Sequence, residues 1–506
     1  MLHGKKNWII GILITLLIFA IPILILVAAP RAESKQVDNP RANLPQHPMP
    51  TDHSGFFADA DFKTGQDVTK ACLECHPEAG EGMLHNNHFT WTHEYALDEV
   101  PGVHDNVIGL KDPVKTGKRY VINNFCITIK PNWPACTACH AGYGWSDDSY
   151  DFDNPENVDC LACHDTTGYY VKAKSGVPAK SVDLVNMAKH VGNPSRLNCG
   201  TCHFRGGGGD AVKHGDLDNS LINPPDDLDV HMGKNNMVCT DCHRYEGEHV
   251  FRGRSISVSL DDKNQSRCTD CHSETPHTDD RINLHTKTVA CQTCHIPAFA
   301  RKEATKTFWD WSQAGQDLPI NNPHEYLKIK GKFVYERNVV PDYAWYNGRV
   351  GNRYLVGDRF DPSKELALNP PAGDINDPNA KIFPFKVHHA TQPYDKKYNI
   401  LLTPHTYGPG GYWSDFDWDK ALKDGAAAFD LPFSGDYGFA RTAMYWPITH
   451  MVAPADQAVQ CNECHTPDGS PGRLDWEALG YPGDPMMYGS RKLPTETANA
   501  NTGGAQ

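Results

Sequence analysis

Cysteine and histidine recur at one fixed spacing along the chain. Of its 17 cysteines, all but Cys126 belong to Cys-x-x-Cys-His motifs. The paired thiols are those of Cys72, Cys75, Cys136, Cys139, Cys160, Cys163, Cys199, Cys202, Cys239, Cys242, Cys268, Cys271, Cys291, Cys294, Cys461 and Cys464. The adjoining histidines are His76, His140, His164, His203, His243, His272, His295 and His465. Two thiols at this spacing can form thioethers with the vinyl groups of one porphyrin, and the adjacent imidazole can bind its iron. Structural zinc needs four ligands per site, and a disulfide framework leaves the repeated histidine unexplained. The motifs therefore predict eight covalently attached haem c groups.

Each haem iron has a second axial position, for which further histidines are candidates. The segments that look arranged to serve a neighbouring haem contain His88, His214, His231, His249, His277, His285 and His450. His85 competes with His88, whereas His3, His47 and His53 lie near the N-terminus and are poor candidates. Seven distal histidines for eight haems leave one iron without an imidazole on that side.

Lys213 is a candidate for that position. It follows four consecutive glycines, Gly206 to Gly209, in the stretch CGTCHFRGGGGDAVKHGDLD. A lysine amine can bind iron only when it is neutral, which requires burial or a nearby metal to lower its pKa. Glycines allow the backbone to approach a macrocycle closely. On the residues alone, a solvated lysine in an ordinary loop is the competing interpretation.

Cys126 is the cysteine outside the motifs, ten residues before Cys136. An unpaired thiol in an oxidising compartment is either reactive or buried as a small hydrophobe. On the residues alone, burial is the favoured interpretation.

From about Lys70 to Tyr481 the chain resembles the octahaem c-type cytochromes of the tetrathionate reductase family. The resemblance rests on CTACHAGYGW, NVDCLACHDTTG, the glycine run with its Asp-x-x-Lys-His-Gly-Asp-Leu-Asp sequence, PDYAWYNG and THMVAPADQAVQCNECH. The order of the eight motifs agrees with it. The family resemblance implies a multihaem c-type cytochrome fold in which one haem is the active site.

The resemblance also implies which residues form that site. The active haem is the one attached through Cys136, Cys139 and His140, and its distal ligand is Lys213. Asp210, Asn123 and Cys126 match the acid, the amide and the free thiol of the family's site. We therefore expect Lys213, Cys126, Asn123 and Asp210 to be the catalytic residues.

The activity implied is the reduction of tetrathionate to thiosulfate, and of nitrite or hydroxylamine to ammonia. Electrons would come from a quinol oxidase or another cytochrome. A conduit that passes electrons without a substrate of its own is the alternative, although a labile site at Lys213 with Cys126 beside it has no use in a conduit. Hydroxylamine oxidation ranks last, since no motif matches the tyrosine cross-link of hydroxylamine oxidoreductases.

An uncharged, mostly apolar run from residue 8 to residue 30 follows Lys5 and Lys6. It is long enough to span a bilayer, and the positive flank keeps the N-terminus cytoplasmic. We expect a retained anchor rather than a cleaved signal, with the rest of the chain on the periplasmic side of the cytoplasmic membrane. The net charge of −14 disfavours binding to nucleic acid, and it also suits simple solubility.

The chain divides by haem density. We predict a membrane anchor or signal at 1–35, a proline-rich tether at 36–66, a seven-haem core at 67–300, a haem-poor region at 301–455, an eighth-haem segment at 456–490 and a disordered tail at 491–506. The expected fold is mainly α, with much irregular structure wrapped around a haem stack and a small β-hairpin in the haem-poor region. The modest hydrophobic fraction of 39% agrees with porphyrins that supply part of the core.

Local patterns in the haem-poor region and after it predict its elements. The stretch LKIKGKFVYERNVV alternates around Gly331, and the Asn347-Gly348 pair indicates a hairpin turn. The stretch SDFDWDKALKDGAAAFD predicts a helix capped by Ser414 or Asp415, and RLDWEALG predicts a helix ending at Gly480.

Overall fold

The computed structural model describes residues 40–492, except 103, 105–106, 247–248, 467–469 and 471. The predicted anchor at 8–30 and residues 493–506 of the predicted tail lie outside these ranges. Within them, no helix has the length and apolar character needed to cross a membrane. Residue 491, placed in the tail by the sequence, donates hydrogen bonds from its guanidinium to the carbonyls of Ile375 and Ala380 at 2.7 and 2.9 Å.

Short helices carry most attachment motifs. The helices are α2 Gly65–Leu73, α3 Pro77–Leu84, α4 Asn87–Thr90, α5 Trp133–Cys136, α6 Leu161–His164, α7 Leu184–Lys189, α8 Arg196–His203, α9 Cys239–Cys242, α10 Asp280–His285, α11 Cys291–His295, α12 Tyr412–Asp415, α13 Trp418–Ala428, α14 Cys461–Cys464 and α15 Pro485–Tyr488. Residues three and four apart share one helix face, so a single turn presents both thiols and the histidine together. The backbone N–H of His272, for example, donates to the Cys268 carbonyl at 2.8 Å.

The motif of His140 departs from this geometry. Its first cysteine ends α5, and a 3-10 turn, Thr137–Cys139, follows. The His140 N–H donates to the Thr137 carbonyl at 2.9 Å, and His140 itself is extended. His140 therefore follows a tighter turn than the other attachment histidines, whose N–H groups donate to the carbonyl of the first cysteine, as His272 does.

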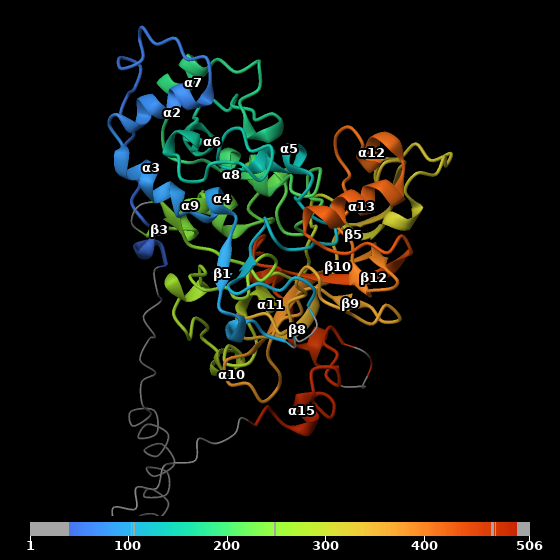
Figure 1. Ribbon diagram of the computed structural model, residues 1–506. Helices are drawn as coiled ribbons and strands as arrows, with labels where there is room; N and C mark the ends of the chain where they lie inside the picture. The colour runs from blue at the N-terminus through green and yellow to red at the C-terminus, as the bar shows by residue number, and fades with distance from the viewer. Residues whose placement is uncertain are drawn as a thin grey trace, which may run out of the picture.

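An eight-stranded sheet occupies the haem-poor region, on the right of Figure 1 beside α12 and α13. Its strands are β5 Thr305–Asp310, β6 Tyr326–Leu327, β7 Gly331–Glu336, β8 Asp342–Tyr346, β9 Leu366–Ala367, β10 Lys381–Asp395, β11 Ile400–Leu401 and β12 Tyr437–Pro447. The order is β6-β7-β5-β10-β12-β9, with β8 and β11 also paired to β10. The long strand β10 runs antiparallel to β12 and parallel to β5. Two-stranded ladders pair β1 His93–Tyr95 with β2 Val114–Thr116, and β3 Tyr245–Glu246 with β4 Val250–Phe251.

This sheet changes the predicted fold class. A mainly α fold with a small hairpin is not confirmed, because the described helices are short and the sheet is the largest element. The alternating stretch around Gly331 contains β6 and β7, which pair antiparallel. The Asn347-Gly348 turn does not form a hairpin, because β8 before it pairs with β10 instead of with a following strand.

Two helix predictions also differ from the structure. The helix predicted from Ser414 or Asp415 is split, because Phe416 adopts a left-handed φ of 54° after α12. The second helix, α13, begins at Trp418 with Asp417 as its N-cap. The segment 473–480 forms turns instead of a helix, and they end at Gly480 with a φ of 86°.

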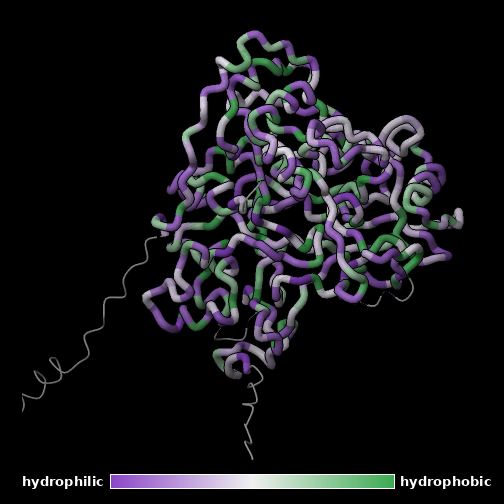
Figure 2. Tube along the Cα trace, turned by 60° about the vertical axis from the view of Figure 1, so that its left-hand side comes forward, coloured by the Kyte–Doolittle hydropathy of each residue, from purple (hydrophilic) through white to green (hydrophobic). Residues whose placement is uncertain are grey.

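The sheet holds the segment that contains the free cysteine. The Trp311 indole donates to the Phe125 carbonyl at 2.9 Å, and the Gln392 amide donates to the Asn123 carbonyl at 3.0 Å. One apolar cluster includes Phe125 together with Trp309 and Trp446 of the sheet. Hydrophobic residues otherwise occur in short stretches along the chain (Figure 2). The haem-poor region therefore builds one wall of the predicted active site.

The described part of the predicted tether lies along the haem-binding core. The Arg41 guanidinium donates to the Asn235 side chain at 3.1 Å, and the Asn193 amide donates to the Pro48 carbonyl at 2.8 Å. The His47 ring is hydrogen bonded to Asp241 at 2.7 Å. Residues 40–66 are thus a strap against the core instead of a spacer that extends away from it.

Candidate functional site

Seven attachment histidines each face a second histidine. The ring centres are 5.9 to 6.4 Å apart in all seven pairs. The pairs are His76 with His53, His203 with His88, His164 with His249, His272 with His231, His243 with His450, His295 with His277 and His465 with His285. Two metal–nitrogen bonds of about 2 Å plus half of each ring give about 6 Å. The spacing therefore fits one haem iron between the two imidazoles of each pair.

Hydrogen bonds leave one ring nitrogen of these histidines free. The Nδ1 atoms of His164 and His243 are bonded to backbone carbonyls at 2.8 and 3.0 Å. The Nδ1 atoms of His450 and His465 are bonded to the carboxylates of Asp216 and Asp484 at 3.1 and 2.6 Å. A hydrogen bond at one nitrogen orients the ring and leaves the other nitrogen for the metal. The hydrogen bonding thus fits the predicted haem as well as the spacing does.

The structure corrects the predicted set of distal histidines at one position. Six of the seven candidates face an attachment histidine, and His88 does so where His85 does not. His214 instead lies edge-on to Trp446, with ring centres 5.0 Å apart. Its place is taken by His53, which the sequence analysis set aside as part of the tether. That segment folds back onto the core, which brings His53 opposite His76.

Replacing His53 with alanine should remove one axial imidazole and change the spin state of one haem in eight. We expect electron paramagnetic resonance to show a loss of about one eighth of the low-spin signal and the appearance of a high-spin signal. His47→Ala is the matched control, because that ring lies in the same strap and bonds to Asp241. An unchanged low-spin signal in His53→Ala would rule out His53 as a ligand.

His140 is the attachment histidine for which no described histidine lies opposite. Aromatic rings surround it, and the nearest centre is that of Trp145 at 4.7 Å. Its Nε2 is bonded to the Phe89 carbonyl at 2.5 Å, whereas Nδ1 is buried with no hydrogen-bond partner among the described residues. Burial lowers the pKa of His140 to about 3. Unlike the paired histidines, His140 is 1% exposed and has its Nε2 bonded and its Nδ1 covered by protein, so its assignment as a haem ligand comes from the Cys136-x-x-Cys139-His140 motif.

Lys213 reaches this motif from a distant part of the chain. Its charge interacts with the thiols of Cys126, Cys139 and Cys136. Burial, assisted by the charge of Lys118, lowers the pKa of Lys213 to about 8. The neutral amine that ligation requires is therefore accessible near neutral pH.

The glycine run makes room for the Lys213 side chain. A Cβ atom on Gly206 would lie 3.2 Å from Cδ of Lys213, and one on Gly207 would lie 3.0 Å from Val212. Gly207 and Gly208 have φ values of 82° and 102°, which favour glycine. The backbone of this loop thus packs directly against the lysine that it precedes.

The other three predicted site residues occupy different positions. The Cys126 thiol contacts the Gly207 carbonyl at 3.8 Å, so it lies against the same glycine loop. Asn123 turns back on its own segment, where its amide donates to the Ile127 carbonyl at 2.9 Å. Asp210 accepts from the Asn219 N–H at 2.9 Å, and burial raises its pKa. The structure therefore brings Cys126 and Lys213 together, while its hydrogen bonds tie Asn123 and Asp210 to their own loops.

Contacts between cysteines of different motifs order the haem sites. The thiols interact in three pairs, which are Cys72 with Cys160, Cys199 with Cys239, and Cys268 with Cys291. Weaker interactions join Cys163 to Cys199, Cys242 to Cys271, and Cys294 to Cys461. The motif of His140 joins this series at one side, because Cys139 meets Cys202 of α8. The sites thus form one row with a branch at the Cys199–His203 motif.

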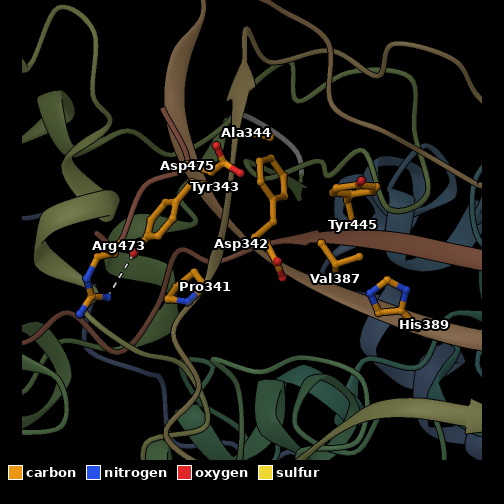
Figure 3. A pocket seen from close by; sticks show the side chains of 10 residues that line it. Pro341, Asp342, Tyr343, Ala344, Val387, His389, Tyr445, Arg473 and Asp475 are labelled. Atoms are coloured by element: carbon orange, nitrogen blue, oxygen red, sulfur yellow. Dashed lines mark hydrogen bonds between the residues drawn. The ribbon is translucent and has the colours of Figure 1, made fainter. Parts of the chain in front are cut away.

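A separate cavity of about 390 Å³ lies beside β8, β10 and β12 (Figure 3). Asp342, His389 and Tyr445 line one part of it, and Arg473 donates to the Tyr343 hydroxyl at 3.2 Å in another. None of the four predicted catalytic residues lines this cavity. This cavity is therefore separate from the site that the sequence analysis predicts at His140 and Lys213.

The attachment motifs and the paired histidines define a multihaem c-type cytochrome. Residues 306–468 match the family model described as bacterial cytochrome c. The crystal structure of octaheme cytochrome c from Shewanella oneidensis is 47% identical, with a TM-score of 0.80, and covers 88% of this chain and 100% of that chain. An uncharacterized protein of Archaeoglobus fulgidus is 24% identical over 261 residues, which is 41% of this chain and 82% of that protein. The chain belongs to the octahaem c-type cytochromes, and it carries eight covalently attached haem c groups.

Proposed function

We propose that the protein is a reductase of small sulfur and nitrogen oxyanions on the periplasmic side of the cytoplasmic membrane. Its substrates are the anions tetrathionate and nitrite together with the neutral nitrogen compound hydroxylamine, and the reaction takes place at the haem attached through Cys136, Cys139 and His140. The observation that carries the proposal is that His140 has a free lysine, Lys213, near its motif where the other attachment histidines have an imidazole. The resemblance to the tetrathionate reductase family supports the same assignment.

A haem held by Cys136, Cys139 and His140 would supply electrons to a substrate at its iron. Lys213 would bind that iron through a single flexible amine, which would yield its place to a substrate more readily than a packed imidazole. Once protonated, its amine stabilises the negative charge that develops on the substrate. Asn123 can donate its amide to the same charge after a rotation away from Ile127. Asp210 positions the loop of Lys213, and its raised pKa suits a proton relay.

Cys126 adds a route for substrates with a sulfur–sulfur bond. Its thiolate attacks a central sulfur of tetrathionate, which breaks that bond and releases one thiosulfate. The product is a mixed disulfide in which the Cys126 sulfur carries the remaining S–SO₃⁻ group. Two electrons delivered to this disulfide release the second thiosulfate and restore the thiolate. The overall reaction consumes one tetrathionate and two electrons, and it yields two thiosulfates.

The electrons come from a quinol oxidase or another cytochrome. The run of residues 8–30 keeps the protein at the membrane, close to such a donor. The row of haem sites carries the electrons to the branch at Cys199–His203, which leads to Cys136–His140.

The row of sites also favours a second candidate, an electron conduit without a substrate. A turnover assay with reduced viologen separates the two functions, with tetrathionate, nitrite and hydroxylamine offered in parallel to the purified holoprotein. Turnover of any of the three supports the reductase. Rapid haem reduction without turnover of any substrate would leave the conduit.

A further inference from the structure

Lys306 is a buried lysine without a polar partner, close to the free cysteine. Its side chain is 3% exposed, and its Nζ lies 3.6 Å from the centre of the Trp309 ring and 3.5 Å from that of Phe333. Within the described ranges, neither a hydrogen bond nor an ion pair to the Lys306 amine is present. These rings hold the amine by cation–π attraction, but a buried lysine is usually paired with an anion as well, and none faces Lys306 among the described residues.

The strand that carries Lys306 is irregular at this position. The register between β5 and β7 is Lys306 with Tyr335 and then Phe308 with Val334, so one residue of β5 has no partner. Such bulges redirect a side chain and are common next to active sites. The irregularity, together with the aromatic rings, holds the Lys306 amine in place.

A second buried lysine in this sheet, Lys386, has the hydrogen-bond acceptors that Lys306 lacks among the described residues. Lys386 is fully buried and donates to the carbonyls of Val212 and Lys213 at 3.2 and 3.0 Å. It also donates to the Thr305 hydroxyl at 2.6 Å. Lys386 is therefore a positioning residue for the backbone of Lys213, and its ammonium group has three hydrogen-bond acceptors.

The Cys126 thiol links Lys306 to the active site. It packs against the apolar cluster that contains Trp309 and Phe333, the two rings that face the Lys306 amine. It also contacts the carbonyl of Gly207, the glycine that lies against the Lys213 side chain. Lys330 adds a further positive charge near Lys306. Its Nζ lies 3.0 Å from the point that a Cβ atom on Gly208 would occupy. In a chain with a net charge of −14, this local group of amines favours an anion.

We propose that Lys306 is a specificity-determining residue that binds the far negative group of a doubly charged sulfur oxyanion. The near end of the anion faces Lys213, and its sulfur–sulfur bond faces Cys126. Nitrite has one charge and hydroxylamine has none, so neither needs a second cation. This inference rests on the proposed function, because it assigns a substrate class to that same site.

The electrostatics agree with such a ligand. Burial lowers the pKa of Lys306 to about 6, and the neighbouring Cys126 works in the opposite direction. A charged amine without a counter-ion is costly in this environment, and an anion that enters the pocket supplies the counter-ion. We would therefore measure binding at pH 6, where about half of the Lys306 amines are charged before the ligand arrives.

The kinetic test is Lys306→Met in the holoprotein. Methionine fills a similar volume and packs well against aromatic rings. We expect KM for tetrathionate to rise about tenfold or more, since a hydrogen bond to a charged group is lost, while kcat for tetrathionate and KM for hydroxylamine stay within about twofold. Lys386→Met is the contrast variant, and it should lower kcat for both substrates alike because it releases the backbone of Lys213. Equal KM values for tetrathionate in wild type and Lys306→Met would overturn the proposal.

Calorimetric titration with thiosulfate at pH 6 tests the same site without turnover. Wild type should bind this dianion about tenfold more tightly than Lys306→Met. Equal binding in both proteins would overturn the inference, even if the wild-type enzyme reduces tetrathionate. Weaker binding in the variant would support the inference, even if no substrate is turned over and the proposed function fails. If Lys306→Met melts at a lower temperature than wild type, Lys306→Gln serves as the second variant with the same expected outcomes.

Discussion

Lys213→Ala should lower kcat for tetrathionate, nitrite and hydroxylamine by about a hundredfold or more. The loss follows because the variant removes the amine that interacts with the Cys136–His140 motif and the donor that stabilises developing negative charge. The viologen-linked assay measures the change in rate. Electron paramagnetic resonance of the oxidised protein should show one haem in eight in a changed ligand state.

Lys328→Ala is the matched control for this prediction. Lys328 is exposed and pairs with Asp317 at 2.7 Å, so its loss should leave both the rate and the spectrum as in wild type. Loss of activity with an unchanged spectrum would place Lys213 near the substrate but away from the iron. Wild-type activity in Lys213→Ala would contradict the proposed active site.

Asp216→Ala should destabilise the protein by about 3 kcal/mol or more, because several buried donors lose their acceptor. The Asp216 carboxylate is 2% exposed and accepts from the N–H groups of Thr449 and His450 at 2.8 and 2.9 Å. It also accepts from the His450 ring at 3.1 Å. Burial alone would raise the pKa of Asp216, but the hydrogen bonds from the His450 ring and from the Thr449 N–H lower it.

The thermal unfolding midpoint of the holoprotein measures this loss. Asp484→Ala is the control, because Asp484 bonds to the His465 ring at 2.6 Å but lies nearer to the surface, with 15% of its side chain exposed. The midpoint should fall clearly more in Asp216→Ala than in Asp484→Ala. Equal midpoints in the two variants would contradict the larger contribution to stability that we expect from the buried contacts of Asp216.

The sequence predicts the attachment sites well because their chemistry is local. Two thiols and a histidine within five residues fold into one turn, as at Cys268–His272, whatever surrounds them. The second axial ligand depends instead on the path of the chain. His53 follows a proline-rich stretch that has no periodicity, and only its packing against the core reveals its partner His76. His214 adjoins the key lysine in sequence, but its ring lies against Trp446.

The sheet was missed for a physical reason as well. Strand β10 contains Pro384 and Pro393, and proline within a run argues against a central strand. In the structure both prolines nevertheless occupy register positions, opposite Tyr343 and Phe439. The strand is buried along most of its length, so it shows no clear alternation of apolar and polar residues. The register of β5 against β7, which places Lys306 opposite Tyr335, also could not be predicted, because β5 contains a bulge next to Lys306.

Under the proposed function, the branch at the Cys199–His203 motif connects the haem at His140 to two arms of the row. One arm runs back through Cys160 to Cys72, and the other runs forward through Cys239 to Cys461. Damage to a haem in either arm leaves the other arm connected to His140, whereas damage at Cys199–His203 isolates it. Electron transfer to His140 could therefore tolerate the loss of a haem in one arm but not the loss of the haem at Cys199–His203. Haems in both arms could also be reduced before a substrate arrives. A reaction that needs several electrons could then take those electrons from the reduced haems in quick succession.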